Sequence, residues 1–428
     1  MHWIKQTIAS WLKAPMLRHM ATLVSGTAIA QLIGVLAAPV LSRLYTPADF
    51  GVLGTLLAIT GVISVISSLK YEMAIVLESD THKANVLQRL CLLILLGTTV
   101  LSAVAFYCAP RWISGLAAHP ELVRILPWGS LLIGLTGLYN IFCFRLNREQ
   151  NYKVIARANI ARRIGTVATQ IIVGFAGATS LGLVLGNGMG CLLCVGVLLP
   201  FVRKETEPGR VTSAELKAVA QTHYRFAAYS APQNLMNALS QNMPVYLLGY
   251  FFGVEVVGSY FFAMRLLQLP SLLIGQSVRR VFFKEAALRV DHPRQLLRLF
   301  CKTTAGLSFV AIPLMIGVFT AGPHLFSWAF GAEWQQAGEF ARWMVLWIGL
   351  GLINPPSGTL YNVLNRQRFF ALYDLCLMGF RIAALVIFGI YGNALTAVQG
   401  YSLVGIVFNL FMILYMGKFL RNKARESC

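Results

Sequence analysis

Three charged side chains lie inside long apolar stretches of the sequence, and they are the first candidates for chemistry. Arg265 interrupts YFFAMRLLQLPSLLIGQSV, residues 260–278, which otherwise reads as a membrane-buried helix. Asp374 and Arg381 lie in a second such stretch, two helical turns apart, and so share one helix face. A charge at bilayer depth costs about 2.5–3.5 kcal/mol on insertion scales, so it usually faces protein or a water-filled passage. The planar, always-protonated fork of a buried arginine suits an anionic group such as a phosphate.

A polar stripe precedes Arg265. Within residues 231–244, APQNLMNALSQNMP, the amides Gln233, Asn237 and Gln241 recur every four residues. That spacing places them on one face of a helix. Such a face is unfavourable against lipid, so it turns to protein or water. Two interpretations stay open: hydrogen bonding between packed helices, or the wall of a wet cleft. The first predicted helix has a sparser version of this polarity, which includes Gln31.

Four further candidates lie toward the ends of predicted helices and are less specific. Arg43 closes the first helix, where its side chain could equally extend to the headgroups. Asn140 lies near the end of the fourth. Acidic residues are scarce, so Glu72 and Asp374 are the candidates for ion coupling, although packing between helices or a headgroup position also explains Asp374.

The composition is that of an integral membrane protein. The chain has 428 residues, of which 57% are hydrophobic and 12% charged, and its mean hydropathy is +0.65. A soluble protein of this length needs more charge on its exterior. Charge-free runs that reach the roughly 20 residues of a bilayer span are residues 20–42, 90–110, 125–144, 164–202, 226–254, 303–332, 343–365 and 382–417.

Two of these runs are long enough for two helices each. The run 164–202 contains GATSLG at 177–182, and the run 382–417 contains YGNA at 391–394. Both stretches are typical of turns. Two further spans lie at 51–69 and around Arg265, and one that begins after Phe369 continues into residues 382–390. The sequence therefore predicts an all-α membrane protein of about twelve transmembrane helices.

A polar stretch at 203–225 divides the chain into halves of six predicted helices each. A short amphipathic pattern at the N-terminus predicts a helix lying on the membrane surface. The predicted organisation is an interfacial helix at 1–19, a first six-helix bundle at 20–202, a linker at 203–225, a second bundle at 226–420 and a tail at 421–428.

The two halves show a faint echo of each other. LYTPADFG at 44–51 lines up with YFFGVEVVG at 250–258 at an offset of 207, which matches Gly51 to Gly258. Asp49 and Glu255 lie close by in the two segments. An even number of helices in each half makes such a repeat parallel, with its axis along the membrane normal.

The basic residues that give the chain its net charge of +20 are unequally divided between the predicted cytoplasmic and outer segments. With the N-terminus in the cytoplasm, most of the 36 basic residues fall in cytoplasmic segments, the longest group being residues 279–302. Only Arg43, Arg111, Arg124 and Arg342 fall in outer segments. This is the positive-inside pattern, so it places both termini in the cytoplasm and argues against nucleic acid as a partner.

No motif of a catalytic or nucleotide-binding domain occurs in the sequence. Walker A and HExxH patterns are absent, and Cys191-x-x-Cys194 has neither a second pair nor a nearby histidine. We therefore expect no enzyme activity, no cofactor and no metal site.

The sequence resembles the polysaccharide (O-antigen, Wzx-type) flippases of the multidrug/oligosaccharidyl-lipid/polysaccharide exporter superfamily from about residue 18 to 420. The similarity lies in TLVSGTAIAQLIGVLAAPVLSRLYTPADFGVLG (22–54), KYEMAIVLES (70–79), FRLNREQNYK (144–153), GYFFGVEVVGSYFFAMRLLQLP (249–270) and VFFKEAAL (281–288). The resemblance implies two six-helix bundles in a V around a central cationic cavity, which receives a polyprenyl-diphosphate-linked sugar chain. Related flippases carry a cavity-facing arginine in the eighth helix, and Arg265 falls in the matching stretch.

The expected function is a flippase for lipid-linked oligosaccharides in the bacterial inner membrane, acting by alternating access. The expected substrate-binding residues are Arg265, Arg381, Arg43, Gln233, Asn237, Gln241, Gln31 and Asn140. Membrane lipid, a polysaccharide polymerase and chain-length machinery are expected partners. The alternatives are a multidrug exporter of the same superfamily, which would favour buried acids, and a membrane-embedded glycan polymerase, which would need a sizeable outer loop.

Overall fold

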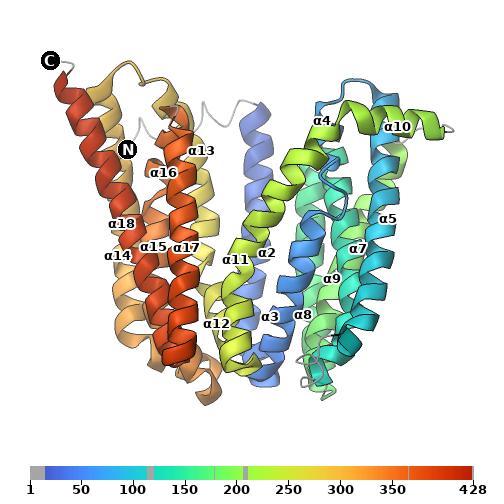
Figure 1. The fold of residues 1–428 in the computed structure, drawn as a ribbon, viewed down its shortest axis with the longest axis horizontal. Helices are drawn as coiled ribbons and strands as arrows, with labels where there is room; N and C mark the ends of the chain where they lie inside the picture. Colours follow the sequence, from blue (N-terminus) through green and yellow to red (C-terminus); the bar gives the residue numbers. More distant parts are fainter. Residues whose placement is uncertain (1–14, 113–119, 178, 206–210, 365, 427–428) are drawn as a thin grey trace. The chain divides into compact units, whose positions relative to one another are not determined.

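The computed structural model describes residues 15–112, 120–177, 179–205, 211–364 and 366–426, and every element in these ranges is helical (Figure 1). The helices of the first half are α2 (Pro15–Leu44), α3 (Pro47–Val65), α4 (Glu72–Leu77), α5 (Thr81–Trp112), α7 (Pro120–Arg148), α8 (Tyr152–Phe175), α9 (Ser180–Glu205) and α10 (Ser213–Thr222). Those that follow are η1 (Phe226–Ser230), α11 (Ala231–Phe252), α12 (Val254–Leu267), η2 (Ser271–Gly275), α13 (Gln276–Ala287), α14 (Pro293–Phe330), η3 (Ala332–Trp334), α15 (Gln335–Ile353), α16 (Pro355–Val363), α17 (Gln367–Tyr391) and α18 (Ala394–Glu426).

About twelve of these helices are transmembrane elements. Within the described ranges, eight helices are long and apolar enough to cross a membrane by themselves, and the bent pair formed by α12 with η2 and α13 makes a ninth. Helices α8, α11 and α15, of 24, 22 and 19 residues, also reach the length of a span. The prediction of an all-α membrane protein with about twelve spans is confirmed.

Both predicted turns separate two helices. The chain leaves α8 at Phe175 and enters α9 at Ser180, and between them Gly177 adopts a φ of 79° that favours glycine. Gly392 and Asn393 separate α17 from α18. One boundary differs from expectation, because α8 begins at Tyr152, well before the apolar run that starts at residue 164. The basic residues between them are therefore helical.

The chain folds as two compact units. Unit 1 comprises residues 1–45 and 52–242, and unit 2 comprises residues 46–51 and 243–428. Helix α11 begins in unit 1 and ends in unit 2. The predicted interfacial helix at 1–19 falls mainly on residues 1–14, which lie outside the described residues. Most of the predicted tail is helical, since α18 continues to Glu426. The predicted domain ranges themselves stay a prediction.

The interior of unit 1 is apolar at its α10 end. Side chains from α4, α5, α7, α8 and α9 form one cluster, and Val219 of α10 completes it. Helix α10 lies across the ends of the longer helices (Figure 1). Thr212 and Glu215 form a capping box at its start. His82 contacts Glu215 at 2.9 Å and His223 contacts Glu78 at 3.4 Å, so two histidine–carboxylate pairs hold α10 against the α4–α5 corner.

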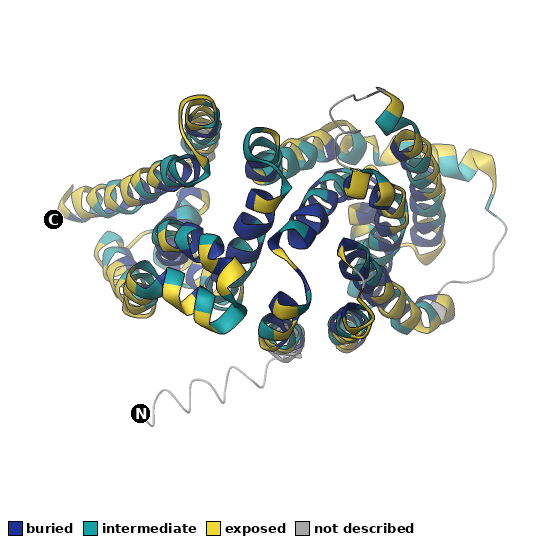
Figure 2. Ribbon diagram, turned by 90° about the horizontal axis from the view of Figure 1, so that it is seen from below, coloured by how far each residue is buried: buried dark blue, intermediate teal, exposed yellow. Residues whose placement is uncertain are grey.

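The interior of unit 2 rests on aromatic and sulphur-containing side chains. Phe282, Tyr361, Met412 and Met416 belong to a cluster contributed by α13, α14, α16, α17 and α18. In Figure 2, buried positions gather inside each unit and exposed positions follow the outer faces of the helices. Many exposed positions are large and apolar, for example Phe309 at 82% exposure, as expected for faces that meet lipid tails.

The two segments of the sequence echo meet each other within unit 2. An added Cβ on Gly51 would lie 1.8 Å from the carbonyl oxygen of Val254, and one on Gly258 would lie 1.7 Å from the carbonyl oxygen of Pro47. Pro47 and Val254 are the first residues of α3 and α12, and they are themselves separated by the offset of 207. The contact is therefore reciprocal, and each glycine allows the backbone of the matching segment to approach.

Candidate functional site

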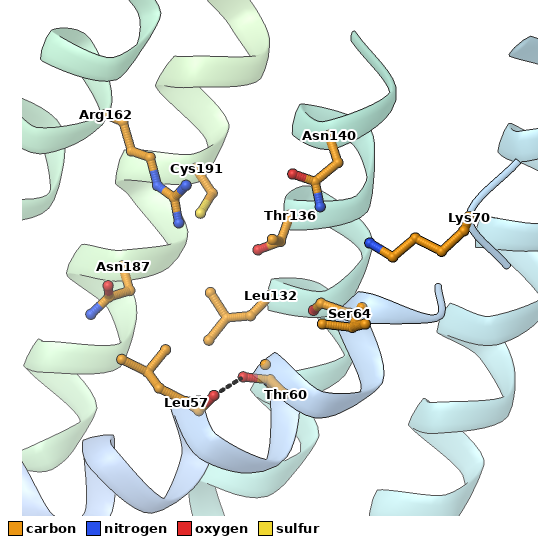
Figure 3. Close-up of a pocket in the computed structure, with 12 residues that line it drawn as sticks. Leu57, Thr60, Ser64, Lys70, Leu132, Thr136, Asn140, Arg162, Asn187 and Cys191 are labelled. Carbon is orange, nitrogen blue, oxygen red and sulfur yellow. Dashed lines mark hydrogen bonds between the residues drawn. The ribbon is translucent and has the colours of Figure 1, made fainter. Parts of the chain in front are cut away.

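Unit 1 contains a cavity of about 280 Å³ that is lined by polar and apolar side chains. We call it the Lys70 cavity. Figure 3 shows Lys70 and Arg162 entering it from opposite sides, with Asn140 and Thr136 of α7 between them and Asn187 of α9 below Arg162. Its remaining walls come from α3 and include Thr60 and Ser64.

A second cavity, of about 430 Å³, shares Arg162 and Asn187 with the first. We call it the Arg163 cavity. Its lining is almost wholly polar or aromatic and comes from α2, α7, α8 and α9: Thr27, Ala30, Gln31, Tyr139, Asn159, Arg162, Arg163, Thr166 and Asn187. The two cavities therefore form neighbouring chambers on either side of the Arg162 side chain.

Lys70 reaches its cavity from an unusual turn. Leu69 and Lys70 link α3 to α4 with φ angles of 49° and 63°, in the left-handed region that costs a non-glycine residue about 1–2 kcal/mol. The Lys70 Nζ lies 3.5 Å from Glu72 Oε1, and Glu72 also accepts a hydrogen bond from Ser68. The buried carboxylate of Glu72 thus holds the lysine from behind while the ammonium group faces the cavity.

Arg162 is held by aromatic and amide groups. Its guanidinium carbon lies 5.4 Å from the centre of the Tyr139 ring, a cation–π distance. The Tyr139 hydroxyl donates to Asn159 Oδ1 at 2.8 Å, which fixes the ring. Such contacts orient the guanidinium without neutralising its charge, so its charge remains for a ligand.

Arg163 lies against α2 where that helix has no side chain. A Cβ added to Gly34 would fall 1.6 Å from Arg163 Nη2, so the guanidinium occupies the space that a side chain at this position would take. The Arg163 Nε is buried without a hydrogen-bond partner. A buried donor that is left unpaired costs free energy, which a bound acceptor would recover.

The electrostatics of the two chambers favour an anion. Lys70, Arg162 and Arg163 contribute three cations, of which Lys70 is paired with Glu72 behind it. No carboxylate is among the described residues that line either chamber, so the arginines make the lining cationic. Charge-assisted hydrogen bonds from guanidinium groups suit phosphate oxygens. The surrounding Asn, Gln and Thr groups both donate and accept, which suits sugar hydroxyls. Within the described part of the chain, no three His, Cys, Asp or Glu side chains are grouped to hold a metal ion.

A family model described as polysaccharide biosynthesis protein matches residues 40–339. The chain belongs to the polysaccharide biosynthesis protein family. Among curated relatives, the teichuronic acid biosynthesis protein TuaB of Bacillus subtilis (strain 168) is 23% identical over 72% of this chain and 64% of its own length. The succinoglycan biosynthesis transport protein ExoT of Rhizobium meliloti (strain 1021) is 21% identical over 75% of this chain and 62% of its own length. The chain thus matches less than two thirds of each relative.

Solved structures place this family member in a known fold. The lipid II flippase MurJ in an inward closed conformation superposes with a TM-score of 0.70 at 15% identity, covering 92% of this chain and 87% of its own. An inward-facing multidrug resistance MATE family transporter of the MOP superfamily gives 0.65 at 11% identity, covering 95% and 96%. At these identities the likeness concerns the fold, which is shared by flippases and drug exporters.

Two residues predicted from the sequence lie in the chambers. Asn140 lines the Lys70 cavity (Figure 3), and Gln31 lines the Arg163 cavity. They come from α7 and α2 and meet only through the packing of unit 1. A direct role of either residue in binding stays a prediction.

The two predicted arginines of the second half lie in unit 2. Arg381 of α17 lies against two adjoining aromatic rings, with its guanidinium carbon 4.4 Å from the ring centres of both Trp347 and Tyr401. Arg265 lies in the last turn of α12 and is half-buried. The central cavity expected between two bundles, and a role for these arginines in it, stay predictions.

The remaining predicted residues are mostly exposed. Gln233, Asn237 and Gln241 form one exposed stripe on α11, in which Gln241 donates to Asn237 at 3.2 Å. Arg43 at the end of α2 and Asp374 on α17 are also exposed. Glu72, in contrast, is buried beside Lys70 as described above. Ion coupling through Asp374 or Glu72 stays a prediction.

Sequence reasoning did not identify three of the residues that line the chambers as site residues. Lys70, Arg162 and Arg163 were counted among the basic residues of cytoplasmic segments, because each lies just outside an apolar run. The sequence does contain a pattern that would place the two arginines on a helix. Residues 152–175 contain no glycine or proline before Gly165, so the helix could be extended back from residue 164. Asn187, the one amide of α9, is a second signal.

Proposed function

We propose that the protein is a flippase for lipid-linked oligosaccharides. It translocates polyprenyl-diphosphate-linked glycan repeat units from the cytoplasmic to the periplasmic leaflet, for O-antigen or another surface polysaccharide. Membership of the polysaccharide biosynthesis family supports the pathway, and the transport function in the name of ExoT supports the activity. The observation that carries the proposal is the pair of cationic chambers in unit 1, which are lined by described residues without a carboxylate.

The chambers match the part of such a substrate that hydrocarbon rejects. A polyprenyl tail can remain in lipid, whereas a diphosphate and sugars cannot cross the bilayer core without polar partners. Arg162 and Arg163 bind the diphosphate, and Lys70 supplies a third positive charge from across the Lys70 cavity. Asn140, with the other amides, exchanges hydrogen bonds with sugar hydroxyls in place of water.

Transport requires that the same site open to each side of the membrane in turn. In transporters built from repeated helical bundles, this occurs by rocking of one bundle against the other. Binding must also stay weak enough for release, and three cations with uncharged polar neighbours meet that need better than a dense basic cluster. The protein accordingly works in the bacterial inner membrane with both termini in the cytoplasm. A polysaccharide polymerase and chain-length machinery act on the product.

A multidrug exporter is the second candidate, because a MATE transporter shares the fold. Cationic drugs need acidic partners in the binding site, by the same electrostatic argument that assigns an anion to arginines. The lining of the two chambers has the opposite charge. An anionic glycolipid is therefore the better match to this chain.

The test is complementation of a strain that lacks the gene. Deletion should abolish the surface polysaccharide and leave lipid-linked repeat units in the cytoplasmic leaflet. Arg162→Ala should fail to restore the polysaccharide at a normal protein level, and Arg162→Lys should restore it in part because the charge remains but the fork does not.

Arg157 provides a matched control. It lies on the same helix, α8, but is exposed and outside both chambers, so Arg157→Ala should complement fully. Normal polysaccharide with Arg162→Ala would refute the role of the chambers. Single repeat units that accumulate on the periplasmic side after deletion would instead indicate a polymerase.

A further inference from the structure

An apolar groove of about 200 Å³ lies on unit 1, between α7, α8 and α9. Trp128 and Leu131 of α7 form one wall, and Met189 and Leu192 of α9 form another, each between 42% and 46% exposed. Gly188 lies in the groove and has open space where a side chain would begin. The groove is therefore an apolar hollow that opens outward from α7 and α9, on helices that span the membrane.

The groove and the Lys70 cavity share a wall. Leu132, which is 4% exposed, borders both of them. On α9, Asn187 and Cys191 line the cavity, and the next residue after each, Gly188 and Leu192, lines the groove. Successive residues of an α-helix point about 100° apart, so groove and cavity occupy adjoining faces of the same two helices.

We propose that this groove holds the first isoprene units of the substrate's polyprenyl chain while the diphosphate occupies the Lys70 cavity. This inference rests on the proposed function, and it adds a place for the apolar part of the same molecule. A polyprenyl diphosphate joins an anionic group directly to a branched hydrocarbon chain. Unit 1 offers the two matching environments on either side of one leucine side chain.

The groove acts by shape rather than by hydrophobicity. Lipid tails are as apolar as the groove, so a polyprenyl chain gains from it only closer van der Waals packing. A polyprenyl chain carries a methyl branch at regular intervals, and a hollow over a glycine accommodates such a branch better than the flat face of a helix does. Seating the first units there would also fix the direction from which the diphosphate enters the cavity.

Photo-cross-linking tests this placement with the full-length protein in phospholipid nanodiscs. Leu131→benzoylphenylalanine places the reactive group in the groove wall, and Leu101→benzoylphenylalanine places it on the exposed face of α5 as a matched control. The probe is a radiolabelled long-chain polyprenyl diphosphate. We expect labelling from position 131 to exceed that from position 101 at least severalfold. It should fall to the control level when Arg162→Ala is added, because the diphosphate then no longer positions the chain.

The outcomes separate this inference from the proposed function. Equal labelling from positions 131 and 101, with binding of inorganic diphosphate still dependent on Arg162, would overturn the groove and leave the proposed function standing. Labelling at 131 that persists in Arg162→Ala would mean that the groove holds chains as any lipid-facing surface does, and would also overturn it. If Arg162→Ala bound inorganic diphosphate as tightly as the unchanged protein does, both the groove and the proposed function would be overturned.

Filling the hollow is an independent test. Gly188→Leu should weaken binding of the long-chain polyprenyl diphosphate about three- to tenfold, in line with the modest energies of packing inside membranes. It should leave inorganic diphosphate binding unchanged. Gly196→Leu is the matched control, since Gly196 lies on the same helix, is exposed and has open space at its Cβ position. Equal affinities in the two variants would contradict the groove.

Discussion

Arg162 in unit 1 and Arg381 in unit 2 are two arginines on membrane helices in opposite surroundings. Arg162 borders two polar chambers and touches one aromatic ring from 5.4 Å. Arg381 has two rings at 4.4 Å. The ring centres of Trp347 and Tyr401 are 5.8 Å apart, so the two rings adjoin each other beside the guanidinium. A charge at membrane depth is therefore not evidence of a ligand site by itself, because rings can stabilise it as well as an anion can.

Removing both chamber arginines should have the largest effect on binding. Arg162→Ala with Arg163→Ala removes two sets of charge-assisted hydrogen bonds, each worth about 1.5–3 kcal/mol. The affinity for inorganic diphosphate should fall by about 100-fold or more, while the thermal stability in detergent changes little. Isothermal titration and a melting curve measure the two quantities. Arg157→Ala should leave both unchanged, and a large loss of stability in the double variant would break the comparison.

Arg381→Ala should show the reverse pattern. The variant loses two cation–π contacts, each worth about 0.5–2 kcal/mol, and the packing of its side chain against Trp347 and Tyr401. We expect the apparent melting temperature to fall by several degrees and diphosphate affinity to stay within about twofold. Arg342→Ala is the matched control, because the exposed Arg342 covers only Phe319, at 5.0 Å. Loss of diphosphate binding in Arg381→Ala would make Arg381 a ligand-binding residue after all.

A smaller effect is expected from crowding the Arg381 stack. A Cβ added to Gly405 would fall 2.4 Å from Arg381 Nη2 and 3.0 Å from Trp347 Cβ. Gly405→Ala should therefore destabilise the protein by about 1–3 kcal/mol, the usual cost of overpacking. The effect should shrink when Arg381→Ala is already present, because the two residues are in contact. Gly379→Ala, on α17 with open space at Cβ, should be nearly neutral, and additive effects of the first two changes would contradict the contact.

The smallest effect is expected at Glu215, whose charged carboxylate is exposed to water. The Thr212 backbone N–H, His82 and the Thr212 hydroxyl hydrogen-bond the Glu215 carboxylate and lower its pKa to about 2. Because this pKa lies below the ordinary value of about 4.3, the carboxylate favours the folded helix above that value, and the benefit is lost as the pH falls toward 2. Glu215→Gln should speed hydrogen exchange of the first α10 amides by a fewfold at neutral pH and hardly at all near pH 2. A change that is independent of pH would exclude the charge as its cause.

The fold followed from patterns that are local in the sequence. Apolar runs gave the spans, and GATSLG and YGNA separated the paired helices where the structure has its breaks. The start of α8 was wrong because counting charges makes residues 152–163 look like a loop. Arg162 and Arg163 face the chambers rather than lipid, and only the packing of α2, α7 and α9 around α8 brings the walls of those chambers together.

The candidate site was less accessible from the sequence than the fold. Gln31 and Asn140 stood out as amides in apolar runs, so they could be named. Lys70 could not, because its direction depends on a left-handed backbone at Leu69 and Lys70 that no glycine marks. The Arg163 guanidinium occupies the space beside Gly34, where α2 has no side chain. The sequence of a helix does not show which neighbouring residue lies against a glycine, so this contact could not be predicted.

Gly51 contacts Val254, and Gly258 contacts Pro47, so each half of the chain restricts which residues the other half can have at this crossing. A methyl group gained at either position would push against the main chain encoded by the other half, so the two sites cannot drift independently. Chimaeras that exchange one half between related proteins should therefore assemble only when both parents provide the same close approach at this crossing.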